Sequence, residues 1–207
     1  MILKNKEKES VKMNYNLIMK EQIEKFTSPQ TLLLHACCAP CSSAVLEKLK
    51  NIFKITVYFY NPNITDKEEY EKRYLELERF IKEFDSNINL IKEEFSPTTF
   101  FEMSKGLEQE PERGRRCYKC YNLRLQKTAL IAEEKNFDFF TTTLSLSPYK
   151  NSNWINEIGA KLDKTYNSNF LYNDFKKEKG YQRSIELSKQ YNLYRQDYCG
   201  CIYSKKS

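Results

Sequence analysis

Seven cysteines in three closely spaced groups are the residues of this sequence best suited to chemistry. Spacings of one to four residues within a group let its sulfurs bind one metal ion or be oxidised and reduced together. Small core cysteines without such a role would be scattered singly along the chain. Three groups in one short chain therefore indicate a shared site. They are Cys37, Cys38 and Cys41, then Cys117 and Cys120, and finally Cys199 and Cys201.

The spacing of the groups favours iron and sulfur over a single zinc ion. A structural zinc site uses two pairs of ligands around a small knuckle, whereas these groups lie far apart in the sequence. A cluster of four irons uses four thiolates. Cys117 and Cys120 are expected at the start of a helix, on one face and near its positive end, which favours thiolates. We therefore expect them to bind a cluster together with Cys37 and Cys38, whose loop must bend.

The sequence Cys199-Gly200-Cys201 differs in kind from the other two groups. A disulfide across a single residue would be strained and easily reduced. Gly200 is the residue best able to adopt the unusual backbone angles that this requires. Two interpretations stay open: a redox-active dithiol, or part of a second metal site together with Cys41.

Three further residues next to the cysteines could supply protons. Asp197 and Tyr198 directly precede the last cysteine pair. His35, the only histidine, comes two residues before Cys37. A lone histidine at the end of a strand is more often a hydrogen-bonded core residue than a metal ligand.

Composition indicates a globular protein of the cytoplasm. The chain has 207 residues, 40% of them hydrophobic, which suits one domain over residues 14–207 after a frayed extension over residues 1–13. No apolar run is long enough to cross a membrane, and the N-terminus lacks the features of a signal peptide. In a reducing compartment, clustered cysteines bind metal or do redox chemistry more often than they form structural disulfides. A net charge of +6 permits an RNA partner without requiring one.

Strand and helix patterns alternate along the chain, which predicts an α/β fold with a parallel sheet flanked by helices. Thr65 and Glu68 have the spacing of a capping box for the third helix. Ligands of such folds bind outside the carboxyl ends of the strands, and Cys37 directly follows the first strand. Strands are expected at residues 31–36, 53–64, 87–95 and 137–151, and helices at 14–26, 42–50, 66–84, 96–106, 118–135 and 154–166, before a mixed C-terminal stretch.

Four separated stretches, in order, resemble the QueH family of epoxyqueuosine reductases. They are LLLHACCAPCSS, RCYKCYNLRL, FTTTLSLSPYKN and GYQRSIELSKQYNLYRQDYCGCIYS, and the similarity spans residues 14–203. The resemblance implies a Rossmann-like fold of the HUP-like group with a C-terminal helical or irregular extension. It also implies the last step of queuosine biosynthesis, the reductive removal of the epoxide oxygen of epoxyqueuosine at the wobble position of tRNA, without cobalamin.

The resemblance also implies which residues act. The family's cysteines for a 4Fe-4S cluster correspond to Cys37, Cys38, Cys117 and Cys120, and its C-terminal redox pair corresponds to Cys199 and Cys201. Because such a cluster passes one electron at a time, a second centre is needed, either that dithiol or an additional iron held near Cys41. The implied partners are a tRNA, presented by its anticodon loop, and an unidentified electron donor, with no membrane involved. Candidates for RNA contact are Tyr149, Trp154, Tyr198, Lys150, Arg115, Arg116, Arg183 and Arg195.

Two other functions would use the same cysteines differently. A metal-free oxidoreductase working by thiol exchange would be colourless and active with dithiol reductants. A zinc-stapled RNA-binding module would contain stoichiometric zinc, and would need a denser basic surface than this sequence provides.

Overall fold

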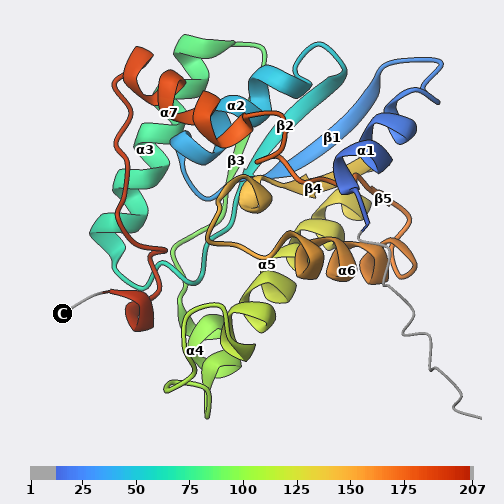
Figure 1. Ribbon diagram of the computed structural model, residues 1–207. Helices are drawn as coiled ribbons and strands as arrows, with labels where there is room; N and C mark the ends of the chain where they lie inside the picture. The colour runs from blue at the N-terminus through green and yellow to red at the C-terminus, as the bar shows by residue number, and fades with distance from the viewer. Residues whose placement is uncertain (1–12, 206–207) are drawn as a thin grey trace, which may run out of the picture.

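A five-stranded parallel sheet organises the structure, a computed structural model that describes residues 13–205 (Figure 1). Apart from Met13, the predicted frayed extension over residues 1–13 lies outside the described residues. The strands lie in the order β3-β2-β1-β4-β5, and all neighbours are parallel, which confirms the predicted α/β sheet. The strands are β1 (Gln30–His35), β2 (Phe53–Phe59), β3 (Asn89–Lys92), β4 (Phe139–Thr142) and β5 (Asn169–Phe170).

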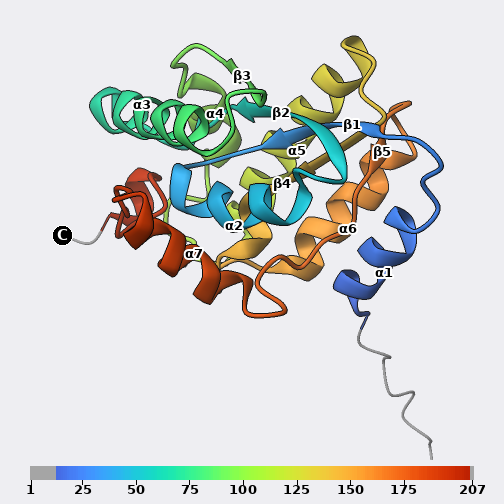
Figure 2. The ribbon, with the colours of Figure 1, turned by 90° about the horizontal axis from the view of Figure 1, so that it is seen from above.

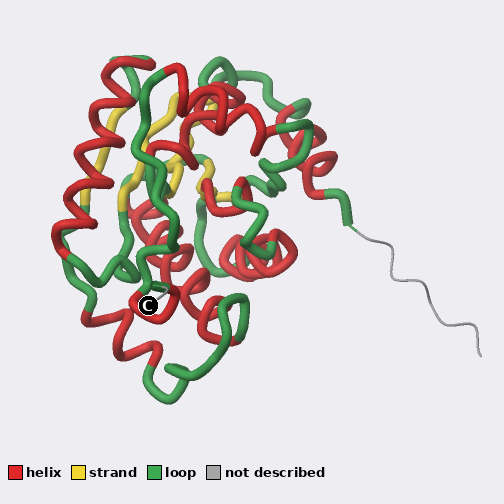
Figure 3. Tube along the Cα trace, turned by 60° about the vertical axis from the view of Figure 1, so that its left-hand side comes forward, coloured by secondary structure: helices red, strands yellow, loops and turns green. Residues whose placement is uncertain are grey.

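Helices surround the strands, as Figure 3 shows. No helix in residues 13–205 combines the length and the apolar composition needed to cross a membrane. The helices are α1 (Tyr15–Ile23), α2 (Ala39–Leu49), α3 (Lys67–Phe84), α4 (Thr98–Ser104), α5 (Arg115–Glu134), α6 (Ser152–Asp163) and α7 (Gly180–Gln190), with short 3-10 turns η1 (Thr143–Leu146) and η2 (Ile202–Ser204).

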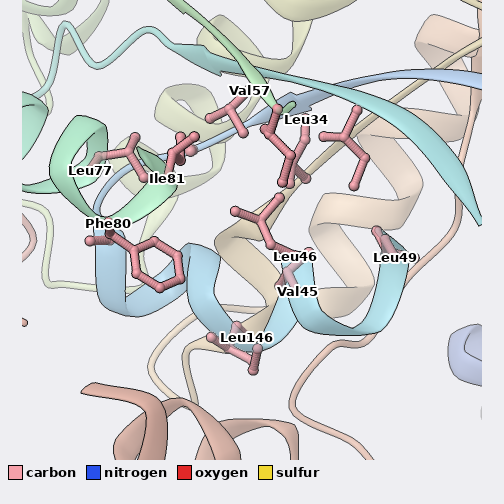
Figure 4. Packing of buried hydrophobic residues seen from close by; sticks show 14 of the residues in the cluster. Leu34, Val45, Leu46, Leu49, Val57, Leu77, Phe80, Ile81 and Leu146 are labelled. Atoms are coloured by element: carbon pink, nitrogen blue, oxygen red, sulfur yellow. The ribbon is translucent and has the colours of Figure 1, made fainter. Parts of the chain in front are cut away.

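The sheet separates two hydrophobic cores. Successive strand residues point to opposite faces, so Leu32 and Leu34 of β1 enter one core and Leu33 enters the other. The first core packs β1 and β2 against α2 and α3, and Figure 4 shows Leu46 and Phe80 meeting the sheet there. The second core packs the sheet against α5 and α6. Both faces of the sheet are thus covered, as parallel sheets require.

The observed helix starts differ from the predicted ones by one to three residues. α2 begins at Ala39 rather than at residue 42, because Pro40 fits the first turn of a helix, where its missing N–H costs nothing. α5 begins at Arg115 rather than at residue 118. At α3 the predicted cap was wrong by one residue, since the side chain of Asp66 accepts the N–H of Glu69 at 3.1 Å. The shifts at α2 and α5 place Cys41 and Cys117 inside helices, as was predicted for Cys120.

The C-terminal stretch contains elements that the sequence patterns did not reveal, β5 and α7. α7 packs beside α2, and the chain then runs along α3 toward the C-terminus (Figures 1 and 2). Hydrogen bonds fix this path: Arg79 donates to Tyr191 O at 3.0 Å, and Thr65 N donates to Gly200 O at 3.3 Å. This segment brings the last cysteines back to the carboxyl end of the sheet.

Candidate thiol site and its cavity

Cys37, Cys38 and Cys41 form a compact group of thiols at the carboxyl end of β1. Cys38 is the N-cap of α2 and Cys41 lies in the first turn of that helix. The three sulfurs all lie within 4.8 Å of one another, and those of Cys37 and Cys38 are 3.7 Å apart. The bend predicted for this loop therefore brings adjacent cysteines to one point. We call these three residues the thiol triad.

Protons are shared unequally within the thiol triad. Hydrogen bonds from Cys38 and then Cys41 hold the pKa of Cys37 well below the usual range of a thiol. Burial raises the pKa of Cys38 to about 12, and the hydrogen bond with Cys37 raises that of Cys41. The amide of Gln196 donates to Cys38 Sγ at 2.9 Å. Cys37 is thus the thiol of the group that ionises most readily, and the thiolate is the form that binds metal.

The second predicted pair lies on α5, in the first two turns of that helix. Burial raises the pKa of Cys117 and raises that of Cys120 to about 12, opposite to the expected effect of the helix start. Cys117 packs against the same hydrophobic cluster as the thiol triad, whereas Cys120 packs with Cys201 and Phe100. Neither sulfur belongs to the group of donors that lie within 4.8 Å of one another. The structure therefore places Cys117 and Cys120 in two different hydrophobic clusters.

Arg124 links the thiol groups to one another. Its guanidinium is buried at 1% exposure, and it donates to the Asn61 side chain and to His35 Nε2. Burial alone would lower the pKa of Arg124, but the negative charges of Cys120, Cys37 and Cys199 raise it. One buried cation thus faces a cysteine from each of the three groups.

The C-terminal cysteine pair is held by its backbone. Arg73, only 2% exposed, donates through Nη1 to Cys199 O and through Nη2 to Tyr198 O, both at 3.2 Å. Its Nε binds Glu69 at 2.6 Å, and Asn63 Nδ2 donates to Cys199 O at 3.2 Å. Cys199 and Cys201 are both free thiols, the first half-buried and the second buried. α3 and the loop before it therefore set the position of Cys199.

Gly200 adopts the unusual backbone angle that the sequence predicted, with φ of +93°. We expect Gly200→Ala to lower stability and activity together. A left-handed alanine costs roughly 1–2 kcal/mol, and its Cβ would also lie 2.8 Å from Ile64 Cγ1 and 3.2 Å from Arg73 Nη1. Urea unfolding and turnover measure the two effects.

Gly106→Ala is the matched control for that substitution. Gly106 also has positive φ, +75°, but a Cβ there would meet nothing within 4 Å. The Gly106→Ala variant therefore has the backbone strain without a steric clash, and it should keep its turnover. Equal losses in the two variants would show that close packing at Gly200 is unimportant.

A cavity of about 620 Å³ opens beside these groups. Residues from after β1, after β4 and from the C-terminal segment form its wall, so it lies at the carboxyl end of the sheet, as predicted. Lys150 Nζ donates to Cys199 Sγ at 3.8 Å, and the charge of Cys199 raises the pKa of Lys150 against the effect of burial. The wall includes Cys37, Cys41, Arg73, Glu112, Arg124, Tyr149, Lys150, Arg195, Gln196, Asp197, Tyr198 and Cys199.

The three predicted proton donors have different surroundings. Asp197 and Tyr198 both line the cavity, Asp197 being exposed and Tyr198 half-buried. His35 is fully buried, with Nδ1 2.8 Å from Thr142 Oγ1 and Nε2 3.0 Å from Tyr60 O. Burial lowers its pKa to about 3, so the ring is neutral. His35 is the hydrogen-bonded core residue that lone histidines more often are.

The residues predicted to contact RNA also differ in their surroundings. Arg116 is buried and donates to three loop carbonyls, so it holds the chain before α5. Arg183 pairs with Glu47 and Glu186, and Trp154 packs edge-on against Tyr118 with ring centres 5.5 Å apart. Arg115 has an exposed side chain, with Glu110 at 3.9 Å. The candidates on the cavity wall are Tyr149, Lys150, Arg195 and Tyr198.

Arg73, Arg124 and Gln196 are site residues that sequence reasoning missed. A usable signal existed for both arginines, because each interrupts the apolar face of its helix. Arg73 lies three residues after Tyr70 and four before Leu77, both of which are buried. An arginine on such a face must find partners inside the protein.

The donors present suit a thiolate-bound metal centre. Thiols are soft ligands that favour iron–sulfur clusters and zinc, and those of the thiol triad are mutually within 4.8 Å. A cluster of four irons needs a fourth thiolate beyond these three. Within residues 13–205, two buried amide oxygens beside the cysteines also have no hydrogen-bond partner, Asn63 Oδ1 and Gln196 Oε1. The site thus has both thiol donors and unsatisfied polar atoms, as expected where a protein binds such a group.

Comparison with known proteins places this site in a family. A sequence model described as Epoxyqueuosine reductase QueH matches residues 32–207. The chain is 42% identical over 202 residues to the epoxyqueuosine reductase QueH of Streptococcus pyogenes serotype M1, covering 94% of this chain and 79% of that protein. It is 42% identical to that of Staphylococcus epidermidis (93% and 85% covered) and 34% identical to that of Thermotoga maritima (84% and 90%). The chain, whose thiol triad lies at the carboxyl end of a parallel sheet, belongs to the QueH family of epoxyqueuosine reductases.

Proposed function

We propose that this protein removes the epoxide oxygen of epoxyqueuosine at the wobble position of tRNA, the last step of queuosine biosynthesis. The observation that carries the proposal is the family match over residues 32–207, which contain all seven cysteines. The geometry supports it, because Cys37, Cys41 and Cys199 share the wall of one cavity. A reducible substrate in that cavity would meet thiols from two distant parts of the chain.

The reaction needs two electrons and two protons. The two carbon–oxygen bonds of the epoxide break, a carbon–carbon double bond forms, and the oxygen leaves as water. Oxidation of the Cys199 and Cys201 thiols to a disulfide would release the required two electrons and two protons. An external reductant, the unidentified electron donor, would then restore the dithiol.

Four cysteines are proposed to hold the 4Fe-4S cluster, namely Cys37, Cys38, Cys117 and Cys120. When bound, such a cluster supplies electrons one at a time. The thiolate character of Cys37 and the shared proximity of Cys37 and Cys120 to Arg124 support this set. Cys41 is the additional thiol of the triad and the proposed ligand of an additional iron. No cobalamin is proposed to take part.

Residues of the cavity wall would orient the substrate and manage protons. Lys150 Nζ lies 3.8 Å from Cys199 Sγ and would hold that side chain toward the cavity. Asp197 and Tyr198 face the same cavity and are the proposed proton donors to the departing oxygen. Arg73 and Asn63 act as positioning residues, because they bind the Cys199 backbone.

The proposed partners follow from the substrate. The modified base lies in the single-stranded anticodon loop, which proteins bind by stacking and by phosphate contacts. A reductant in the cytoplasm, where we propose that the protein works, would supply the electrons.

Anaerobic purification followed by iron, sulfide and zinc assays, a visible spectrum and a turnover assay without cobalamin tests the proposal. We expect about four irons and four sulfides per chain, with or without one further iron, and conversion of epoxyqueuosine in tRNA to queuosine. A colourless, metal-free enzyme active with dithiols would support the thiol-exchange alternative. Stoichiometric zinc without turnover would support the RNA-binding module.

A further inference from the structure

A second hollow adjoins the first cavity and takes no part in the proposed chemistry. Its volume is about 720 Å³, and its wall shares Lys150 and Tyr181 with that of the first cavity. The turn over residues 147–151 lies between the two, because Ser147 and Tyr149 face the first and Pro148 and Asn151 face the second. An extended ligand could therefore occupy both hollows by passing over this turn.

Tyr149 projects from the turn with 62% of its surface exposed, an unusual exposure for a large aromatic side chain. The turn that carries it is tied to the loop before α5. Arg113 donates through Nε to Tyr149 O at 3.2 Å and through Nη2 to Pro148 O at 3.4 Å. The Arg113 guanidinium lies 5.5 Å from the centre of the Tyr149 ring. The ring is thus supported from one side and open to solvent.

The wall of the second hollow is basic and rich in polar groups. Among the described residues, Lys150, Lys176 and Lys177 line it together with one acid, Asp174. Asp174 is paired with Lys176 at 2.7 Å, and Lys150 Nζ donates to Cys199 Sγ in the first cavity, so Lys177 supplies the positive charge of the second hollow. Asn14, Asn151 and Asn153 add amide groups able to bind sugar and phosphate oxygens. An aromatic platform beside a basic hollow is the usual surface for single-stranded nucleic acid.

We propose that the nucleotide next to the reacting one in the anticodon loop stacks its base on the exposed ring of Tyr149 and places its phosphate in the second hollow, near Lys177. This inference rests on the proposed function, since it assumes that the reacting base enters the first cavity. Enzymes that modify a base extract it from its stack and also contact the neighbouring nucleotides. The turn at residues 147–151 would then lie between the reacting base in the first cavity and the neighbouring phosphate in the second hollow.

Binding of an unmodified anticodon stem–loop RNA, followed by fluorescence anisotropy, measures this site separately from catalysis. Stacking on an aromatic ring is lost in Tyr149→Ala, so its Kd should rise roughly 5- to 150-fold. Tyr149→Phe keeps the ring and should bind like the wild type. The KM for tRNA should rise with Kd in Tyr149→Ala.

Lysine variants test the phosphate contact through its dependence on salt. Lys177→Ala should reduce the slope of log K against log salt by about one, as the loss of one phosphate contact does. Lys135→Ala is the matched control, because this exposed lysine ends α5 at the amino end of β4, away from both hollows. Its affinity and salt slope should equal those of the wild type.

The outcomes separate this inference from the proposed function. If the wild type does not convert tRNA, the proposed function fails whatever the RNA variants do. If the wild type is active, and folded Tyr149→Ala and Lys177→Ala proteins bind RNA as it does, the second hollow is not an RNA site. Equal weakening in Tyr149→Phe and Tyr149→Ala would assign the effect to the hydroxyl and overturn the stacking.

Discussion

Replacing Cys37 by alanine should remove bound iron, visible absorbance and turnover together. Cys37 is the thiol of the triad whose pKa is lowered, and its sulfur faces both Arg124 and Lys150. Its removal takes away one thiolate ligand of the proposed cluster, which needs four. Iron and sulfide assays on anaerobically purified protein, with turnover of epoxyqueuosine-containing tRNA, measure the effect. A coloured or active Cys37→Ala protein would contradict the assignment.

Cys41→Ala and Cys117→Ala decide which thiols complete the cluster. If Cys37, Cys38, Cys117 and Cys120 hold it, Cys117→Ala should lose the whole cluster, and Cys41→Ala should lose one iron at most. If the thiol triad holds the metal, Cys41→Ala should be the more damaging of the two. Cys201→Ala is the control among buried cysteines, since its proposed role lies in the redox pair and its iron content should stay at the wild-type value.

Much of the fold could be predicted because its strands are short apolar runs bounded by polar segments. The strands β1 and β2 are buried along most of their length. Their apolar residues therefore made both strands recognisable in the sequence. β5 was missed because a two-residue strand has no period. The start of α2 was misplaced although Pro40 signals it, because the cysteines before it were interpreted as a loop.

The candidate site was predictable in its residue types and only partly in its geometry. The spacing of Cys37, Cys38 and Cys41 made them one group, and the structure brings their sulfurs together. No local pattern could show that Arg73 binds the carbonyl of Cys199, because 126 residues separate them. Such a contact depends on the path of the whole C-terminal segment across α3, which only tertiary packing determines.

Arg73→Met should destabilise the protein by roughly 3–5 kcal/mol, the usual cost of removing one partner of a buried ion pair. The side chains of Arg73 and Glu69 are only 1% and 12% exposed, so the abandoned carboxylate would have little water to replace the guanidinium. The carbonyl of Tyr198 would lose the donor Arg73 Nη2, and that of Cys199 would keep only Asn63 Nδ2. Urea unfolding measures the loss. The control is Lys82→Ala on the same helix, whose ion pair with Glu78 has a 70% exposed lysine and should contribute less than about 1 kcal/mol.

A structural role alone would not change the reactivity of one particular thiol, and this gives Arg73 a sharper test. Under native conditions, alkylation of Cys199 should become faster in Arg73→Met, because the backbone that carries this thiol is released. Lys82→Ala, the control on the same helix, should leave the alkylation rate of Cys199 at the wild-type value. Arg73→Lys should recover only part of the wild-type behaviour. Its ammonium keeps the positive charge, but it lacks the planar guanidinium that binds two carbonyls and a carboxylate at once. Unchanged Cys199 reactivity in a folded Arg73→Met protein would show that the arginine stabilises α3 without positioning the C-terminal thiols.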